Sequence, residues 1–335
     1  DSVGVIDFAG PGEYTLYNEI AVGDEILDLR DNVADLEIRG DEVWLALYDG
    51  RLARIEDLIH TGGSGEQVTL FDAETADMDP VDITVDGSDN LWISGNNGYA
   101  TIAAKVSADL NTWTYYDTTD LRIAELGDDE VYDIEVADNG TACFLTHYGI
   151  SYMDSEGTVS VVSGSEGTYT KGFVVDGNTL YWTYDGTPLA VLYEYDLVTE
   201  QETNQIYDTD VGMESGPTHL TVYDGARDAA GQLWLCTHWG VIYEDTEGNW
   251  HTILDDLYPD NLVSDPSGTI WISYGSYPYN DTLMQVNSAG EVLAKFSSED
   301  IEELGWLNGI VDLEADGNGH AVYDRLHVEC AVVES

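Results

Sequence analysis

An aspartate recurs at one place in this sequence, four residues before a turn that itself often begins with aspartate. The recurring residues are Asp35, Asp82, Asp133, Asp224 and Asp312, with Gly172 and Asn261 at the same place in two further copies. Carboxylates gathered from several segments attract hard cations, so they form a predicted site for Ca²⁺, Mg²⁺, Na⁺ or K⁺. A second interpretation needs no cofactor, because each carboxylate can instead accept a hydrogen bond from a backbone amide of the next repeat. Recurrence with the repeat favours this structural role.

A second set of residues is mostly aromatic and falls in or beside short loops that follow apolar strands. These loops are predicted to open on the same side as the start of the aspartate-bearing strands, so their side chains are expected to share one surface. Aromatic rings beside hydrogen-bonding groups suit a glycan or a protein partner. Packing of several rings between neighbouring repeats is the alternative. The set is Tyr48, Asn96, Asn97, His147, Tyr148, Tyr184, His238, Trp239, Tyr274, Tyr277 and Tyr279.

Two histidines, His147 and His238, stand at equivalent places in different repeats, each with an aspartate in the same repeat. One hypothesis is a pair of histidine and carboxylate for acid/base chemistry, as in a lyase-like site. The other is that both are solvated loop residues. The sequence contains no serine-hydrolase, zinc-protease, phosphate-loop, dinucleotide or EF-hand motif. No catalytic residue is therefore assigned.

The segments that must position these residues share the pattern D-x-x-G-x-[LI]-W. It is clearest from Asp228 to Trp234 and from Asp265 to Trp271. Runs of alternating apolar residues flank the copies, which predicts a hairpin turn that joins two strands. Weaker copies are Asp86 to Trp92, Gly140 to Cys143, Asp316 to Val322, Val43-Trp44 and Leu180-Tyr181.

Each hairpin is followed by a turn that often contains glycine and by two further predicted strands. Four short antiparallel strands per repeat are typical of a β-propeller blade. Seven copies of the turn predict an all-β, seven-bladed β-propeller with four antiparallel strands per blade. The first strand of each blade would line the central channel, which places the recurring aspartates near the channel mouth.

The repeats resemble those of propellers of the two-component-regulator type and are similar to those of streptogramin lyase and other Trp-rich propellers. The resemblance rests on turns such as Asp228 to Trp234 and covers nearly the whole chain. It implies the fold but no single function, since such propellers serve as sensors, adhesins, lyases, lactonases and scaffolds. Cys143, Tyr181 and Val322 replace the tryptophan of the pattern, which indicates that their blades have diverged.

Both ends of the chain are predicted to complete the last blade of a single domain that spans residues 1–335. Val3 to Asp7 and Gly12 to Tyr17 resemble the outer half of a blade, and the segment from about Gly309 to Tyr323 supplies the inner half. Such a join leaves no sheet edge open. The tail from residue 327 to 335 is a candidate for a further strand. The chain begins at Asp1 without Met, so a removed signal peptide is an open expectation.

The chain carries 66 acidic and 10 basic side chains, for a formal net charge of -56, yet its 9 Trp and 22 Tyr distinguish it from a disordered acidic chain. Near 1 M salt the Debye length falls to about 3 Å and screens such repulsion. A halophilic source, either a haloarchaeon or its virus, explains the charge. A calcium-loaded secreted protein and an acidic mimic of nucleic acid are alternatives. The scarcity of Lys and Arg disfavours nucleic acid and anionic membranes as partners, and no apolar run is long enough for membrane insertion.

These observations predict a non-enzymatic, salt-adapted module for binding or adhesion that contacts a glycan or a protein through its loop faces. The expected location is extracellular, on a cell surface or a virion, with the cytoplasm of a salt-accumulating organism as a further possibility. Two alternatives stay open. One is a lyase or hydrolase that uses a divalent metal at the channel mouth, and the other is a structural subunit of a larger viral assembly.

Overall fold

A computed structural model gives the fold of the chain. Side chains are described for most of the residues between 33 and 295 and for Leu313. The tail from 327 to 335 lies outside the described residues. The described residues are 3–7, 14–17, 19–22, 25–28, 33–39, 42–48, 50–56, 67–71, 78–96, 101–167, 169–185, 191–207, 210–212, 220–254, 257–264, 268–276, 279–297, 310–315 and 320–325.

The turn aspartate organises each clear copy of the repeat. Asp86 accepts hydrogen bonds on Oδ1 from the backbone N–H of Ser88 at 2.9 Å and of Asn90 at 3.0 Å. Its Oδ2 accepts the indole N–H of Trp92 at 3.3 Å, and Asp228 serves three donors with the same spacing. Burial alone would raise the pKa of Asp86, but hydrogen bonds from Asn90 and Lys105 lower it to about 2. The spacing between Asp and Trp in the sequence motif is fixed because one carboxylate must accept hydrogen bonds from these three donors.

The glycine of the motif lies in the left-handed region of backbone conformation. Gly231 has a φ of 84° and Gly268 a φ of 89°. Asp89, which replaces glycine in a weaker copy, has a φ of 60°. Aspartate tolerates this region better than most side chains do, so the weaker copy still forms the turn.

These turns join the first two strands of six four-stranded antiparallel blades, each formed by one continuous stretch of chain. From inner to outer strand, the blades are blade 1 with β5 (Val33–Arg39), β6 (Glu42–Leu47), β7 (Leu52–Glu56) and β8 (Gln67–Phe71); blade 2 with β9 (Asp79–Val85), β10 (Leu91–Asn96), β11 (Ala103–Val106) and β12 (Trp113–Tyr116); blade 3 with β13 (Asp133–Val136), β14 (Ala142–Thr146), β15 (Gly149–Met153) and β16 (Val159–Val161); blade 4 with β17 (Tyr169–Asp176), β18 (Thr179–Asp185), β19 (Val191–Asp196) and β20 (Gln201–Tyr207); blade 5 with β21 (Val222–Arg227), β22 (Leu233–Thr237), β23 (Gly240–Glu244) and β24 (Trp250–Ile253); and blade 6 with β25 (Tyr258–Ser264), β26 (Thr269–Ser276), β27 (Tyr279–Asn287) and β28 (Val292–Ser297).

The number of blades of continuous chain is therefore six, which corrects the seven predicted from the turn copies. The copy from Asp316 to Val322 belongs to a sheet of a different kind. The two inner strands of this sheet come from the end of the sequence, and its two outer strands come from the beginning. This closing sheet has the order β2-β1-β30-β29. Its strands are β1 (Val3–Asp7), β2 (Tyr14–Tyr17), β29 (Ile310–Ala315) and β30 (His320–Arg325).

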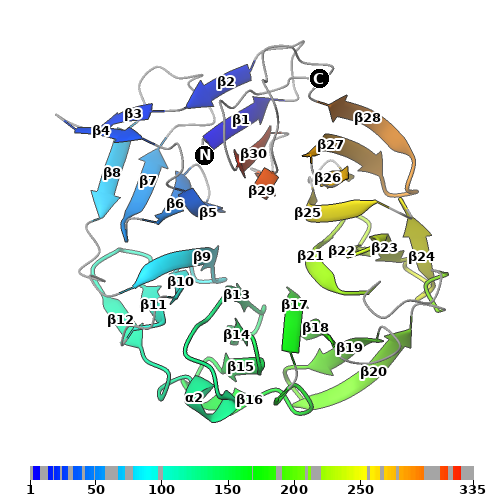
Figure 1. The fold of residues 1–335 in the computed structure, drawn as a ribbon, viewed down its shortest axis with the longest axis horizontal. Coiled ribbons are helices and arrows are strands. Elements are labelled where there is room, and N and C mark those ends of the chain that lie inside the picture. The colour runs from blue at the N-terminus through cyan, green and yellow to red at the C-terminus, as the bar shows by residue number, and fades with distance from the viewer. Residues whose placement is uncertain are drawn as a thin grey trace.

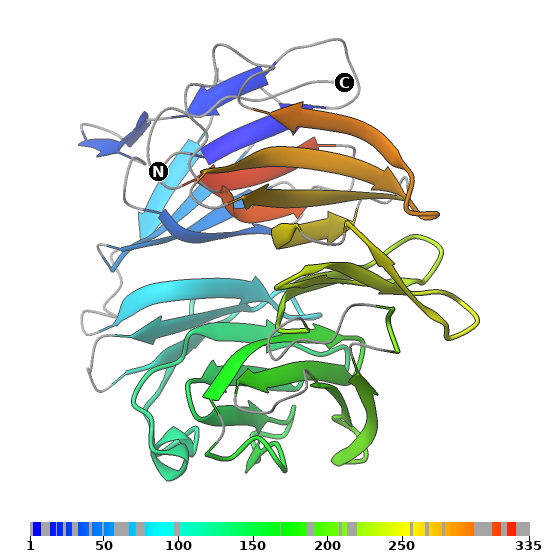
Figure 2. The same ribbon diagram turned by 45° about the vertical axis from the view of Figure 1, so that its right-hand side comes forward.

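The blades and the closing sheet surround a central axis (Figure 1). Inner strands of neighbouring sheets contact one another around the ring, and β29 of the closing sheet contacts both β25 and β5. Figure 2 shows the same sheets in an oblique view. The arrangement is a β-propeller, as the sequence predicted. Two short strands, β3 (Glu19–Val22) and β4 (Glu25–Asp28), pair in a separate hairpin beside β8.

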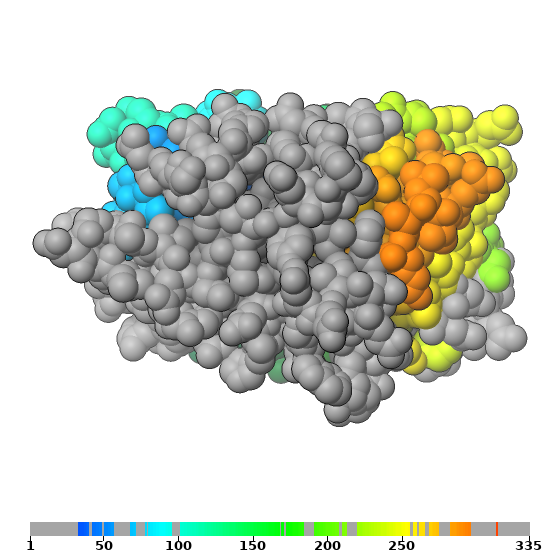
Figure 3. Space-filling view, turned by 90° about the horizontal axis from the view of Figure 1, so that it is seen from above, coloured from blue at the N-terminus to red at the C-terminus, as the bar shows by residue number. Residues whose placement is uncertain are grey.

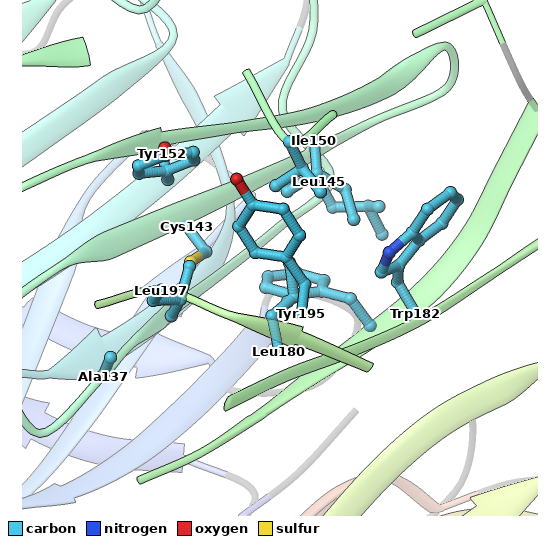
Figure 4. Packing of buried hydrophobic residues seen from close by; sticks show 11 residues of the cluster. Ala137, Cys143, Leu145, Ile150, Tyr152, Leu180, Trp182, Tyr195 and Leu197 are labelled. Carbon is cyan, nitrogen blue, oxygen red and sulfur yellow. The ribbon is translucent and has the colours of Figure 1, made fainter. Parts of the chain in front are cut away.

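The hydrophobic core lies between adjacent blades. Between blades 3 and 4, Cys143, Trp182 and Tyr195 pack in one cluster and are almost entirely buried (Figure 4). Cys143, which replaces the motif tryptophan in blade 3, is fully buried in this cluster. On the outside of blade 6, Val292 and Leu293 in β28 are about half exposed. Blade 6 forms the orange part of the surface in Figure 3.

One helical turn, α2 (Ile123–Leu126), follows blade 2 and was not predicted from the sequence. It is only 4 residues long, which is too short to show a helical period in the sequence. Ile123 and Leu126 are buried, and the Leu126 side chain lies beside Gly149. The turn therefore anchors the segment that leads into β13.

Candidate functional site

The inner strands enclose a cavity of about 310 Å³ on the axis of the ring. Four of the predicted aspartates, Asp35, Asp82, Asp133 and Asp224, line it. Asp312 lies in β29, but its side chain is outside the described residues. Two carboxylates that the sequence analysis did not single out, Glu37 and Glu135, also line the cavity. Four of the five predicted aspartates thus line the channel, and the sequence analysis underestimated the acidity of this channel.

Most of the lining aspartates accept a backbone hydrogen bond from the next blade. Asp35 Oδ2 accepts the N–H of Ile83 at 2.8 Å, and Asp82 Oδ2 accepts the N–H of Ile134 at 2.6 Å. Asp224 accepts the N–H of Leu262 in the same way. This is the structural role that recurrence with the repeat favoured, because one carboxylate per blade fixes the neighbouring inner strand.

Blade 3 departs from this rule. The backbone acceptor there is Glu135, whose Oε2 accepts the N–H of Val175 at 2.7 Å, whereas Asp133 contacts the carboxyl group of Asp82. Burial raises the pKa of Asp133 well above its ordinary value, and Asp82 and Glu135 raise it further. Burial also raises the pKa of Glu135, against the lowering effect of the bond from Val175. The channel therefore holds carboxyl groups that resist losing their protons.

Blade 4 has no carboxylate at this level because its backbone leaves no room for one. A Cβ atom on Gly172 would lie 1.9 Å from the carbonyl oxygen of Val222 in the next blade. Any side chain would force the two inner strands apart. Gly172 is thus required by close packing of backbones, and it interrupts the ring of acidic side chains.

Within the described residues, no group of three or more His, Cys, Asp or Glu is arranged to hold a metal ion. The carboxylates of the channel are distributed around the cavity, and their backbone bonds hold several of them against neighbouring strands. The predicted site for a hard cation stays a prediction that the geometry of the described side chains does not favour.

His147 lies beside tyrosines of two blades at the channel mouth. The hydroxyl of Tyr132 is 2.7 Å from Nδ1 of His147. Tyr169, the first residue of β17, stacks on the imidazole with ring centroids 5.4 Å apart and an interplanar angle of 11°. Tyr148 contacts it edge-on at 6.3 Å. We call Tyr132, His147, Tyr148 and Tyr169 the first rim cluster.

Hydrogen bonds set the orientation of this histidine. Its backbone N–H donates to Asp128 Oδ2 at 2.6 Å, and the hydroxyl of Tyr132 donates to Glu130. Burial, followed by the bond to Glu130, raises the pKa of Tyr132, so its hydroxyl stays protonated. Because the single phenolic proton goes to Glu130, the hydrogen between Tyr132 and His147 comes from Nδ1 of His147.

The same arrangement recurs two blades further on. The hydroxyl of Tyr223 is 2.7 Å from Nδ1 of His238. Tyr258, the first residue of β25, meets His238 edge-on with centroids 5.3 Å apart, and Trp239 packs against Tyr258 at 5.6 Å. We call Tyr223, His238, Trp239 and Tyr258 the second rim cluster. Tyr223 also lines the axial cavity, which connects this cluster directly to the carboxylates.

A β-bulge in the inner strand of blade 5 places the hydroxyl of Tyr223, and in blade 3 a backbone hydrogen bond holds Tyr132 just before β13. In blade 5, Val222 opposes Thr237 and Asp224 opposes Cys236, so Tyr223 is the extra residue. In blade 3, the N–H of Tyr132 bonds to the carbonyl of Leu145, the residue that already opposes Asp133. Where two residues of one strand oppose a single residue of its partner, the strand bends. The side chain of the extra residue then turns toward the channel mouth.

The structure brings several of the predicted binding residues to this rim. His147, Tyr148, His238 and Trp239 belong to the rim clusters, and Tyr48 lies in the equivalent turn of blade 1 with 51% of its surface exposed. Tyr274 is buried in the core between blades 5 and 6, where Lys295 lies 5.1 Å above its ring. Its predicted exposure is wrong. The residues that lie wholly or by their side chains outside the described part are Asn96, Asn97, Tyr184, Tyr277 and Tyr279.

Tyr132, Tyr169, Tyr223 and Tyr258 are rim residues that the sequence analysis missed. A signal for two of them is present, because Tyr132 precedes His147 by the same number of residues as Tyr223 precedes His238. The other two begin the inner strand of the following blade. Only the closed ring brings them beside the histidines.

No protein-family model matches the chain. None of the helices in the described part of the chain is long and apolar enough to cross a membrane.

Solved structures of low identity share the fold. One is PorZ, a surface component of the type-IX secretion system of Porphyromonas gingivalis, with a TM-score of 0.64 and 16% identity. The match covers 93% of this chain and 48% of PorZ, so the chain spans about half of that protein. YCF48 bound to D1 peptide is similar with a TM-score of 0.58 and 13% identity over 97% of this chain and 98% of YCF48. The extracellular domain of the putative hybrid two component system BT4673 from B. thetaiotaomicron has a TM-score of 0.50 and 15% identity over 78% of this chain and 38% of that one. These likenesses show that the chain has a β-propeller fold, and at such identities they show the fold alone.

Proposed function

We propose that this protein is a non-enzymatic binding module that holds a protein or glycan partner on the face formed by its two rim clusters. The observation that carries the proposal is the duplicated arrangement of tyrosine, histidine and tyrosine at the channel mouth. Tyr148 is 44% exposed, Tyr169 42% and Tyr223 38%. Large rings that present both an apolar face and a hydrogen-bonding group are enriched where proteins bind partners.

The hydrogen bonds of the rim favour binding over acid/base catalysis. Nδ1 of His147 bonds to Tyr132 at 2.7 Å, while the nearest Asp128 oxygen is 3.8 Å away. The histidine is thus oriented by a neutral phenol and not by a carboxylate that would activate it as a base. In both rim clusters a tyrosine hydroxyl lies 2.7 Å from Nδ1 of the histidine, which suits two similar contact points on one partner better than a single reactive centre.

The proposed location is extracellular, on a cell surface or a virion. PorZ, which shares the fold, is a surface component of a secretion system, and YCF48, which also shares it, binds a peptide. The formal net charge of -56 supports work in high salt, where the repulsion between like charges is screened. We therefore place the module in a halophilic setting.

The test uses two sets of probes, a displayed library of short random peptides and an array of immobilised oligosaccharides. Ligands selected on the unaltered protein are measured again on the double variant Tyr148→Ser/Trp239→Ser. We expect about a tenfold or greater loss of affinity, because truncation of central aromatic residues removes much of the binding energy of an interface.

Tyr115→Ser is the matched control. Tyr115 is also exposed, at 39%, but it lies on the outer strand β12 and stacks on Trp113. This variant should bind every selected ligand as the unaltered protein does. If neither probe set yields a ligand that the double variant weakens, or if Tyr115→Ser weakens it equally, the rim is not a binding face and the proposal is rejected.

A further inference from the structure

The axial cavity behind the rim is rich in acidic side chains among the described residues that line it. Six carboxylate-bearing residues line it, and the described lining contains no Lys, Arg or His. They are Asp35, Glu37, Asp82, Asp133, Glu135 and Asp224. Tyr223 lines the same cavity and belongs to the second rim cluster, so the cavity is continuous with the proposed binding face.

Three basic side chains among the described residues pack over tryptophan rings and do not line this cavity. Arg39 and Arg54 lie 5.1 and 5.9 Å from the ring of Trp44, and Lys105 lies 4.6 Å from the ring of Trp92. Backbone N–H groups satisfy individual oxygens of the lining carboxylates but add no positive charge. Burial raises the pKa of Asp133 and of Glu135, and the neighbouring carboxylate of Asp82 raises both further.

We infer that the partner is a protein segment with an exposed lysine or arginine, and that this side chain enters the channel mouth past Tyr223 toward Asp82 and Asp133 while flanking residues lie on the two rim clusters. This inference rests on the proposed function and narrows it from any protein or glycan to a cationic peptide segment. Charge complementarity and the continuity of rim and cavity carry it.

The size and lining of the cavity fit such a side chain. A volume of about 310 Å³ is at the small end of the range of roughly 300 to 1,000 Å³ for ligand pockets, which suits one long side chain. Tyrosine rings at the entrance attract cations through their faces. A buried charge pair is screened by salt much less than an exposed one is, so the contact can persist in molar salt.

The experiment compares two displayed peptide libraries, one with all residue types and one that lacks Lys and Arg. Selected peptides are measured by fluorescence anisotropy against the unaltered protein and the variant Asp82→Asn/Asp133→Asn, which removes the charge of this pair and keeps a side-chain oxygen to accept the N–H of Ile134. We expect the full library to enrich Lys or Arg at one fixed position. Replacement of that residue by Gln should weaken binding about tenfold or more, and so should the variant.

Two further measurements keep the outcome clear. Asp109→Asn/Asp154→Asn removes the same formal charge at exposed turns and should leave affinity unchanged. Because the peptide and protein changes remove one contact, their effects should not add. Thermal unfolding of Asp82→Asn/Asp133→Asn should show that the variant is folded, and a variant that does not fold is replaced by Asp133→Asn alone, again measured for non-additivity.

If the library without Lys and Arg yields peptides that bind as tightly and still depend on Tyr148 and Trp239, the inference is overturned while the proposed function stands. Effects that add, or a rim-dependent ligand that is a glycan, overturn it in the same way. If no ligand depends on the rim at all, the proposed function itself fails.

Discussion

Among single residues, Asp133 shows how the channel holds a carboxyl group that lacks a backbone donor. Asp35 and Asp82 each accept a backbone N–H from the next blade. Among the described residues, no backbone N–H donates to Asp133, and its carboxyl group contacts that of Asp82. Two carboxyl groups in contact share a proton more readily than they share two negative charges.

Asp133→Asn should therefore stabilise the fold at neutral pH. A carboxyl group whose folded pKa is raised contributes stability below its unfolded pKa of about 4 and loses this contribution as pH rises toward the folded value. At pH 7 the variant avoids that loss, and its amide can donate to Asp82. We expect a gain of roughly 1 to 3 kcal/mol in the free energy of unfolding by urea at pH 7, and a smaller gain near pH 4.

Asp109→Asn is the control for this prediction. Asp109 is exposed, and hydrogen bonds from Ser107 and Asn111 lower its pKa to about 2, the opposite direction from Asp133. Its replacement should give no gain at any pH. A loss of stability in Asp133→Asn at pH 7 would show that Asp133 works in its ionised form.

The sequence predicted residues well where a repeat specifies them and poorly where the ring does. The turn aspartates and the channel aspartates follow fixed spacings, and most form the bonds that those spacings imply. Tyr169 and Tyr258 reach the histidines only because a neighbouring blade packs beside them. Tyr274 was misplaced because a pattern of strands and turns does not say whether a ring points outward or toward the adjacent blade.

At the scale of strands, two neighbouring inner strands can lie so close together that only glycine fits between their backbones. Gly172 in β17 faces the backbone carbonyl of Val222 in β21 at a distance that no Cβ atom can occupy. Backbone cannot move aside as the end of a flexible side chain can. The gap in the series of channel carboxylates is thus a consequence of how blades 4 and 5 pack.

Gly172→Ala should accordingly destabilise the protein by roughly 1 to 3 kcal/mol or more, measured by urea unfolding, since it forces two inner strands apart. Gly87→Ala is the matched control, because a Cβ atom at Gly87 meets nothing within 4 Å. Its effect should stay within about 0.5 kcal/mol. Equal effects of the two substitutions would mean that the strands can separate without cost.

For the whole molecule, the formal net charge of -56 opposes the compact state in dilute buffer. The repeat pattern and the ring of blades do not depend on this charge, so the sequence predicts the fold class without it. The sequence analysis counted the sheet that both ends of the chain complete as a seventh blade, whereas the structure has six blades of continuous chain and a separate closing sheet.

The fold should loosen below about 0.5 M salt. The Debye length grows as salt is removed, so the surface carboxylates repel one another over longer distances. Near-ultraviolet circular dichroism and urea unfolding across a series of KCl concentrations measure this. Sucrose at matched osmolality is the control and should not replace the salt, since it carries no charge. Full cooperativity of unfolding in low salt would contradict the screening argument.

The closing sheet has a consequence for the order of events during folding. Gly4 pairs with Tyr323, so this contact joins positions near opposite ends of the sequence, and contacts of such long sequence separation form slowly. During synthesis, β1 and β2 leave the ribosome before the six continuous blades and wait for β29 and β30, while each blade can assemble as it emerges. The ring therefore stays open until β29 and β30 have been synthesised, and its last step is the pairing of β1 with β30.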